Sequence, residues 1–460
     1  MRRFPLLALG VVAAVPAAQA QSRPPIRPLG PVVAKTTAPV GLVTSVRALP
    51  GGRVLLNDAL QRRVVLLDST LANATVVADT TAATGNAYGG RIGGLIPFRG
   101  DSTLFVDAAS MSMLVIDPNG KVGRTLSVPR AQDANALVSA AFGTPGFDAK
   151  GRLVYRSMPQ FRFAGPPPGA AGGSGAMPLP EMPDSAALVR VDLATRAVDT
   201  VGFVKTPKIR MQVTESGEGR RSISSVFNPL PQADDWAVLS DGTIAIVRGR
   251  DYHLDLVTPD GTTRSAAKVP FDWQRLTDEQ KVTFMDSVKA QRARMGAVGG
   301  MDMGGAPRMM MQINEGPGGP PPRGGGERRV QVEGGMQVAV GGPPGAGGPS
   351  AAAGGAAAAA AAPLIFVDPS ELPDYRPPFL ANSARADAQG NVWIRTTAAA
   401  TAPGALVYDV VNAKGELVDR VQVPAGRQIM GFGPDGSVFL MAREGQGATA
   451  TTTLERARIR

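Results

Sequence analysis

Six short β-rich runs, each opened by a turn that contains Gly or Asp, recur along this chain. They lie at Gly51–Asp58, Gly100–Asp107, Asp148–Arg156, Ser240–Arg248, Asp387–Arg395 and Gly433–Arg443. Because Gly and Asp suit the backbone angles of tight turns, such a turn beside a strand is typical of a β-hairpin. The recurrence predicts that the chain builds one small antiparallel sheet again and again.

The spacing of the runs and a second hairpin downstream of them predict a six-bladed β-propeller. Three of the intervals between runs are close to the roughly 40 to 50 residues of a four-stranded blade. The second hairpin is clear in Leu114–Leu126, Leu254–Ala266 and Leu406–Val421, which gives four strands per blade. We therefore expect an all-β fold with blades 1–4 in residues 41–273 and blades 5 and 6 in residues 363–460.

The longest interval, between blades 4 and 5, predicts an inserted helix and a disordered segment. Thr277 and Gln280 match a helix capping box, and apolar residues continue at helical spacing from Val282, so one helix is expected within residues 274–295. Residues 296–362 are mostly Gly, Ala, Pro and Met. Such a segment cannot bury enough apolar surface to offset its ordering entropy, so we expect disorder there.

The N-terminal 20 residues are predicted to be an export signal. Two arginines precede a short apolar run, Leu6–Val15, and the small-residue cleavage site Ala18–Ala20. The run is shorter than the about 20 residues that a membrane helix needs. The protein is therefore expected in the periplasm or outside the cell, without a membrane span.

The sixth blade is one strand short, because only Thr451–Ile459 remains after its hairpin. An open edge would leave backbone groups unpaired. We expect residues 21–40, which include Val32 and Val33, to close the ring by pairing within that blade.

Composition excludes several classes of site. The chain has no cysteine, and it has one histidine, His253, so thiolate sites and histidine-based zinc sites are excluded. The net charge of +10 is spread along the chain without a dense basic block that contains aromatic residues. A nucleic-acid partner is therefore not expected. We also expect the protein to be a monomer.

Blade 1 resembles an NHL-type propeller repeat. The resemblance rests on the Gly turn, the strand that ends in Asp, the basic residue and the second acidic turn, here Gly52, Val54, Asp58, Arg63 and Asp68. Later blades depart from this motif, because Arg replaces the strand-end Asp. The resemblance implies a six-bladed fold and says little about activity. Streptogramin-lyase and amidating-lyase propellers would require several histidines, which this chain lacks.

The ends of the second strands form the candidate site. In a blade of antiparallel strands, all of these ends collect on one face of the disc. They carry two carboxylates and four guanidiniums, which favours an anionic ligand because Arg binds carboxylate and phosphate bidentately. The candidate ligand-binding residues are Asp58, Asp107, Arg156, Arg248, Arg395 and Arg443. The alternative is that these side chains pair with neighbours or face water.

The sequence therefore predicts an exported, non-catalytic propeller that binds a protein partner or a small anionic ligand on one face, without a cofactor. One alternative is a lactonase-like hydrolase that uses Ca²⁺ bound to oxygen ligands such as Asn57, Asp58, Asp107 and Asp251. A second is a copper-binding envelope protein, because thioethers select Cu(I) and Met residues crowd between Met295 and Met311.

Overall fold

The structure is a computed structural model that describes residues 23–89, 92–158, 183–208, 210–216, 220–296, 311–313, 328–332, 336–340, 365–445 and 450–459. The expected signal peptide lies outside these residues, and so does most of the segment predicted to be disordered. Within that segment three short strands are described: β21 (Met311–Ile313), β22 (Arg328–Val332) and β23 (Met336–Val340).

Six sheets, each built on four antiparallel strands, form the blades of a β-propeller. Blade 1 contains β3 (Val43–Ala48), β4 (Val54–Asp58), β5 (Arg63–Leu67) and β6 (Ala74–Ala78). Blade 2 contains β7 (Gly93–Pro97), β8 (Thr103–Asp107), β9 (Ser112–Ile116) and β10 (Val122–Ser127). Blade 3 contains β11 (Gly146–Phe147), β12 (Leu153–Arg156), β13 (Ser185–Val191) and β14 (Val198–Lys205).

The remaining blades have the same order of strands. Blade 4 contains β17 (Asp235–Val238), β18 (Ile244–Arg248), β19 (His253–Val257) and β20 (Thr263–Ser265). Blade 5 contains β25 (Phe379–Ala386), β26 (Val392–Thr396), β27 (Leu406–Val411) and β28 (Leu417–Val423). Blade 6 contains β29 (Arg427–Phe432), β30 (Ser437–Glu444), β31 (Thr451–Arg458) and β2 (Val32–Lys35).

The turn between the first and second strands has the same hydrogen bond in every blade. A backbone N–H donates to the carbonyl oxygen four residues later, at N···O distances from 2.8 to 3.0 Å. The pairs are Leu49–Arg53, Phe98–Ser102, Asp148–Arg152, Leu239–Thr243, Asp387–Asn391 and Gly433–Ser437. These are the six hairpins that the sequence predicts, and they confirm the repeat.

Antiparallel strands give the disc two distinct faces. We call the face that carries these six turns the hairpin face. The opposite face, where the second strands end and where the chain passes from one blade to the next, is the crossover face. Every candidate residue predicted from the sequence lies in the last two positions of a second strand, and therefore at the crossover face.

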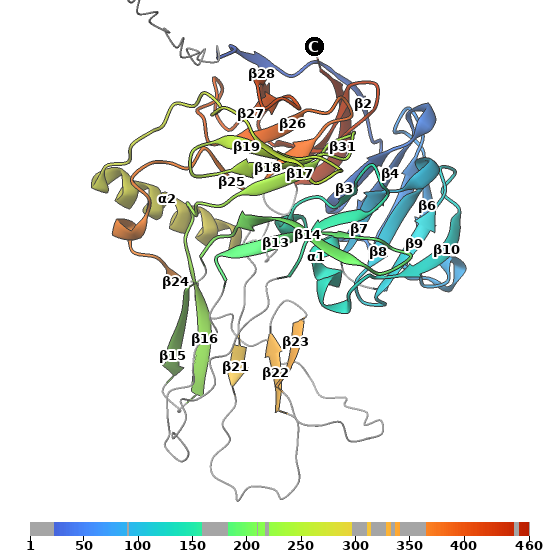
Figure 1. The fold of residues 1–460 in the computed structure, drawn as a ribbon, viewed down its shortest axis with the longest axis horizontal. Helices are drawn as coiled ribbons and strands as arrows, with labels where there is room; N and C mark the ends of the chain where they lie inside the picture. Colours follow the sequence, from blue (N-terminus) through green and yellow to red (C-terminus); the bar gives the residue numbers. More distant parts are fainter. Residues whose placement is uncertain are drawn as a thin grey trace, which may run out of the picture.

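The N-terminal segment contributes strands to two blades. β2 pairs antiparallel with β31 and supplies the outermost strand of blade 6, as Figure 1 shows for the blue and red ends of the chain. β1 (Ile26–Pro28) pairs parallel with β28 and extends blade 5 to five strands. Arg27 forms an ion pair with Asp419 beside this added strand.

Two insertions on either side of blade 4 join into a small second core. One carries the hairpin β15 (Arg210–Ser216) and β16 (Arg220–Phe227), and the other carries α2 (Asp278–Gly296) and β24 (Ile365–Phe366). Figure 1 shows the hairpin of β15 and β16 projecting away from the blades, whereas α2 lies beside them. Its buried residues are Val226, Leu230, Met285, Val367 and Leu372.

The helix α2 begins as the sequence predicts. The capping box is present, because Thr277 N–H donates to Gln280 Oε1 and Gln280 N–H donates to Thr277 Oγ1. Neither α2 nor any other helix in the described part of the chain combines the length and the apolar character that crossing a membrane requires.

Candidate functional site

The two carboxylates of the predicted site fasten the incoming chain to the blade. Asp58 is fully buried and accepts hydrogen bonds from the backbone N–H groups of Gly41 and Leu42, at 2.9 and 3.1 Å. Asp107 accepts one from Gly89 N–H at 3.1 Å and one from Ser110 Oγ at 2.6 Å. Both carboxylates therefore join the end of the second strand to the segment that leads into the first.

Arg248 makes the same connection in blade 4 with the charges reversed. Here the acid, Asp234, lies in the incoming segment, and Arg248 Nη1 donates to Asp234 Oδ2 at 2.7 Å. Arg248 Nε also donates to Asp255 Oδ2 at 2.7 Å. The guanidinium of Arg248 is thus held by two carboxylates within the protein.

The other three predicted arginines have different surroundings. Arg156 lies over the ring of Phe142, 4.5 Å from its centroid, and burial lowers the pKa of Arg156 to about 10. Arg395 is half-buried beside Tyr408, its partner across the strand pair. Arg443 is exposed at the end of β30. The six residues therefore share a face, but Asp58, Asp107 and Arg248 serve contacts within the protein.

The other residues considered for calcium binding, and the single histidine, also form contacts within the protein. Asn57 Nδ2 donates to Thr44 Oγ1 and to the Gly93 carbonyl oxygen. Asp251 lies 2.7 Å from His253 Nδ1, and Asp255 lies 3.3 Å from His253 Nε2. Among the described residues, no three His, Cys, Asp or Glu side chains gather as a metal-binding group. The Met-rich tract of the copper hypothesis lies outside the residues whose side chains are described.

A cavity of about 730 Å³ lies on the axis of the propeller. All six innermost strands line it, together with turns of the hairpin face. On the opposite side it is lined by the segment Leu137–Pro145, which includes the end of the short helix α1 (Ala134–Val138). This connection between blades 2 and 3 replaces most of an inner strand, because β11 has only two residues. The cavity therefore opens toward the hairpin face, whereas the predicted residues lie at the crossover face.

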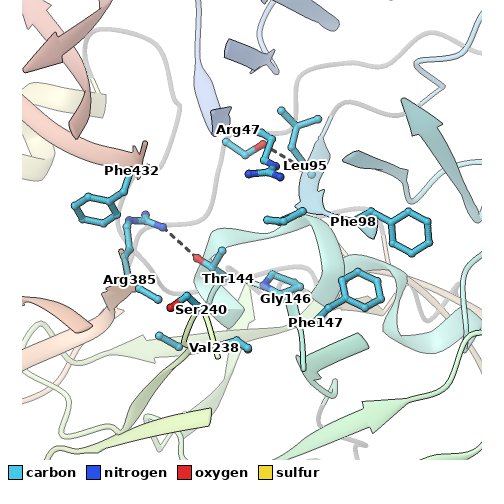
Figure 2. A pocket seen from close by; sticks show the side chains of 18 of the residues that line it. Arg47, Leu95, Phe98, Thr144, Gly146, Phe147, Val238, Ser240, Arg385 and Phe432 are labelled. Carbon is cyan, nitrogen blue, oxygen red and sulfur yellow. Dashed lines mark hydrogen bonds between the residues drawn. The ribbon is translucent and has the colours of Figure 1, made fainter. Parts of the chain in front are cut away.

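Two arginines project into this cavity from blades 1 and 5 (Figure 2). In the described part of the chain, the Arg47 side chain makes no hydrogen bond or ion pair, and its Nε is buried. Arg385 Nη1 donates to Thr144 Oγ1 at 3.2 Å, a neutral acceptor. Burial lowers the pKa of both arginines, and Asp101 counteracts that change at Arg47. Both guanidiniums thus carry charge that no carboxylate in direct contact neutralises.

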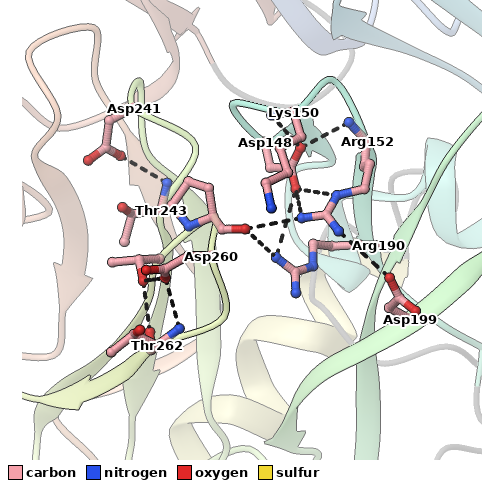
Figure 3. A network of polar contacts seen from close by, with 11 residues as sticks. Asp148, Lys150, Arg152, Arg190, Asp199, Asp241, Thr243, Asp260 and Thr262 are labelled. Atoms are coloured by element: carbon pink, nitrogen blue, oxygen red, sulfur yellow. Dashed lines mark hydrogen bonds and ion pairs between the residues drawn. The ribbon is translucent and has the colours of Figure 1, made fainter.

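The acids that line the cavity already bind other side chains of the protein. Asp148 is buried and accepts from Arg152 Nε at 2.8 Å, with Arg190 Nη1 at 3.9 Å (Figure 3). Asp387 accepts from the side chains of Asn391 and Trp393, both at 2.9 Å. The cavity also has two exposed cations at its mouth, Arg99 and Lys150. The lining is therefore cationic overall.

One buried carboxylate lies near Arg156 and Arg385. Asp235 accepts N–H bonds from Ser383 and Ala384 of blade 5, at 2.6 and 3.0 Å. Burial raises the pKa of Asp235, and the nearby Arg156 counteracts that rise. Asp235 also favours the charged form of Arg385. Its carboxylate thus acts on both guanidiniums through the electric field, while it accepts hydrogen bonds from the backbone N–H groups of Trp236, Ser383 and Ala384.

Arg47 and Arg385 are not among the site residues predicted from the sequence. Both lie in innermost strands, and the sequence motifs do not define the bounds of those strands. Each lies two residues before the N–H donor of a hairpin turn. At that position the other four blades have small or apolar residues: Ile96, Gly146, Ala237 and Gly431. Arginine occurs at this position only in blades 1 and 5, and this departure from the repeat is the sequence signal that could have identified the two residues.

Comparison of the sequence with protein-family models and with curated protein sequences finds no match. Among solved structures, the chain resembles a calcium-binding protein, regucalcin, from Agrobacterium tumefaciens, at 13% identity and a TM-score of 0.38, over 95% of this chain and 98% of that one. It also resembles a gluconolactonase from Xanthomonas campestris, at 10% identity and a TM-score of 0.35, over 94% and 99% of the two chains. It also resembles virginiamycin B lyase from Staphylococcus aureus, at 9% identity and a TM-score of 0.33, over 93% of this chain and 99% of that one.

Proposed function

We propose that this protein is an exported, non-catalytic propeller of NHL type that holds a small anionic ligand in its axial cavity. The observation that carries the proposal is the pair Arg47 and Arg385, whose charges lie inside the cavity without contact to any carboxylate of the described residues. A ligand inside a cavity of about 730 Å³ is a small molecule, which favours a small ligand over a protein partner.

The physical argument concerns the cost of burying charge. A guanidinium that leaves water loses hydration, and only a charged or well-placed polar partner restores that free energy. Arg47 lacks such a partner among the described residues, and Arg385 has one neutral acceptor. A bound carboxylate or phosphate would supply charge-assisted hydrogen bonds to both. Arg99 and Lys150 at the mouth would attract the same anion.

Thermal unfolding of the full chain in the presence of single anions tests the proposal. Sulfate, phosphate, acetate and citrate are each added at low ionic strength, and bound anion is recovered and analysed. We expect at least one to raise the Tm, since a ligand at 100 times its Kd adds about 2.7 kcal/mol to the free energy of unfolding. The anion should be recovered chemically unchanged.

The double variant Arg47→Gln/Arg385→Gln is the decisive comparison. It should lose the rise in Tm while keeping the fold, as judged by circular dichroism. A rise of equal size in the double variant, or no response of the wild type to any of the anions, would contradict the proposal.

A further inference from the structure

The cavity lining combines cationic and apolar side chains. Arg47 and Arg385 come from β3 and β25, the innermost strands of the two blades that flank blade 6. Blades 2, 3 and 4 contribute the apolar side chains Leu95, Phe147 and Val238, and the turns of blades 2 and 3 add Arg99 and Lys150 at the mouth. Figure 2 shows Arg47 beside Leu95, and Arg385 beside Phe432.

The apolar side chains keep exposed surface inside the cavity. Phe147 and Val238 are half-buried, and so is Phe432, which comes from blade 6 between the blades of the two arginines. The Phe147 ring is braced by Phe98, at a centroid distance of 5.2 Å, and the Phe432 ring by Trp393, at 5.1 Å. Braced rings of this kind form fixed walls, and surface left on them is available to an apolar group of a ligand.

Resting on the proposed function, we propose that the ligand is an organic anion that carries an apolar, ring-sized group. Its anionic end lies between Arg47 and Arg385, and its apolar part lies against Phe432 and Val238. An inorganic anion would satisfy the guanidiniums alone and leave the apolar walls in contact with water. An organic anion pairs with the guanidiniums and also covers the apolar walls. Each square ångström of apolar surface removed from water adds to the affinity.

A pair of probes with the same anionic group separates the two contributions. Inorganic phosphate and phenyl phosphate both carry close to two negative charges at pH 8. Isothermal titration of the full-length protein should give a Kd for phenyl phosphate at least tenfold lower than for phosphate. Phenol, which lacks the anionic group, should show no measurable binding.

Single variants assign the preference to the cavity. Val238→Thr keeps the shape of the side chain and adds a hydroxyl, so it should reduce the preference for phenyl phosphate at least threefold without changing the phosphate Kd. Phe432→Leu should act in the same direction if Val238→Thr fails to fold. Arg124→Gln removes one exposed charge from β10 and should leave both dissociation constants unchanged.

The outcomes distinguish this inference from the function on which it rests. Equal Kd values for phosphate and phenyl phosphate would overturn the inference and leave the anion site intact. Binding of neither probe would overturn the inference, and it would overturn the proposed function as well if sulfate, acetate and citrate also fail to raise the Tm. A preference for phenyl phosphate that survives in both Val238→Thr and Phe432→Leu would place the apolar contact elsewhere and overturn the inference.

Discussion

The two faces of the propeller use charged residues in opposite ways. At the crossover face, Asp58, Asp107 and Arg248 recur at one position of the repeat and join each second strand to the incoming chain. Toward the hairpin face, Arg47 and Arg385 occur where the other blades have small or apolar residues, and no carboxylate among the described residues contacts them. The difference teaches that a charge at this repeated position stabilises its blade where it pairs with the incoming chain, whereas a charge found in only two blades and without a carboxylate partner among the described residues marks a candidate binding site.

The largest expected effect is on stability, at the crossover face. Asp58→Ala removes a buried carboxylate and leaves the N–H groups of Gly41 and Leu42 without acceptors. We expect the free energy of unfolding to fall by about 3 kcal/mol. Denaturant unfolding measures this, and a loss under about 1 kcal/mol would show that the carboxylate does not fasten the blade.

Arg248→Met should cost about 2 kcal/mol, because Asp234 and Asp255 both lose their charged partner. Arg443→Met provides the matched control on the same face. Its side chain is exposed, so the change in free energy of unfolding should stay within about 0.5 kcal/mol. Similar losses in both variants would mean that burial and pairing do not separate these two arginines.

The pH dependence of stability tests the burial of Arg156, whose pKa lies at about 10 in the folded protein. The usual value is higher, so the unfolded chain binds more protons above pH 10 and the folded state gains stability as pH rises. Between about pH 8 and pH 10.5, wild type should gain roughly 1 kcal/mol relative to Arg156→Met. Parallel profiles for the two proteins would contradict the lowered pKa.

The smallest effect is expected for the cavity arginines. Arg385→Gln loses one hydrogen bond to Thr144 and relieves the burial of an unpaired charge. These terms oppose each other, so the free energy of unfolding should change by less than about 0.5 kcal/mol without ligand. A loss as large as that of Asp58→Ala would make Arg385 a structural residue and remove the contrast between the faces.

The repeat itself was predictable from the sequence because its turns are local. Gly242 and Gly390 have φ values of 81° and 83°, in the left-handed region that glycine adopts without strain, and each marks a hairpin. The capping box of α2 is local in the same way, since Thr277 and Gln280 contact each other within one helical turn.

The candidate site depends on contacts that span the chain. Arg385 and its acceptor Thr144 are 241 positions apart, and no local pattern brings them together. The strand β1 was not expected, because Pro28 ends a run of only three residues that pair with distant β28. The second-strand arginines share one face because strand direction alternates within each blade, but the axial cavity depends on how six innermost strands meet.

The most direct test compares phosphate and phenyl phosphate binding in two double variants by isothermal titration. Arg47→Gln/Arg385→Gln removes two guanidiniums from the cavity, and Arg395→Gln/Arg443→Gln removes two from the crossover face. We predict that the first raises the Kd by about 100-fold, as expected for two charge-assisted hydrogen bonds, and that the second changes it less than about threefold. Loss of binding in the second variant, with binding retained in the first, would contradict the assignment of the site to the axial cavity.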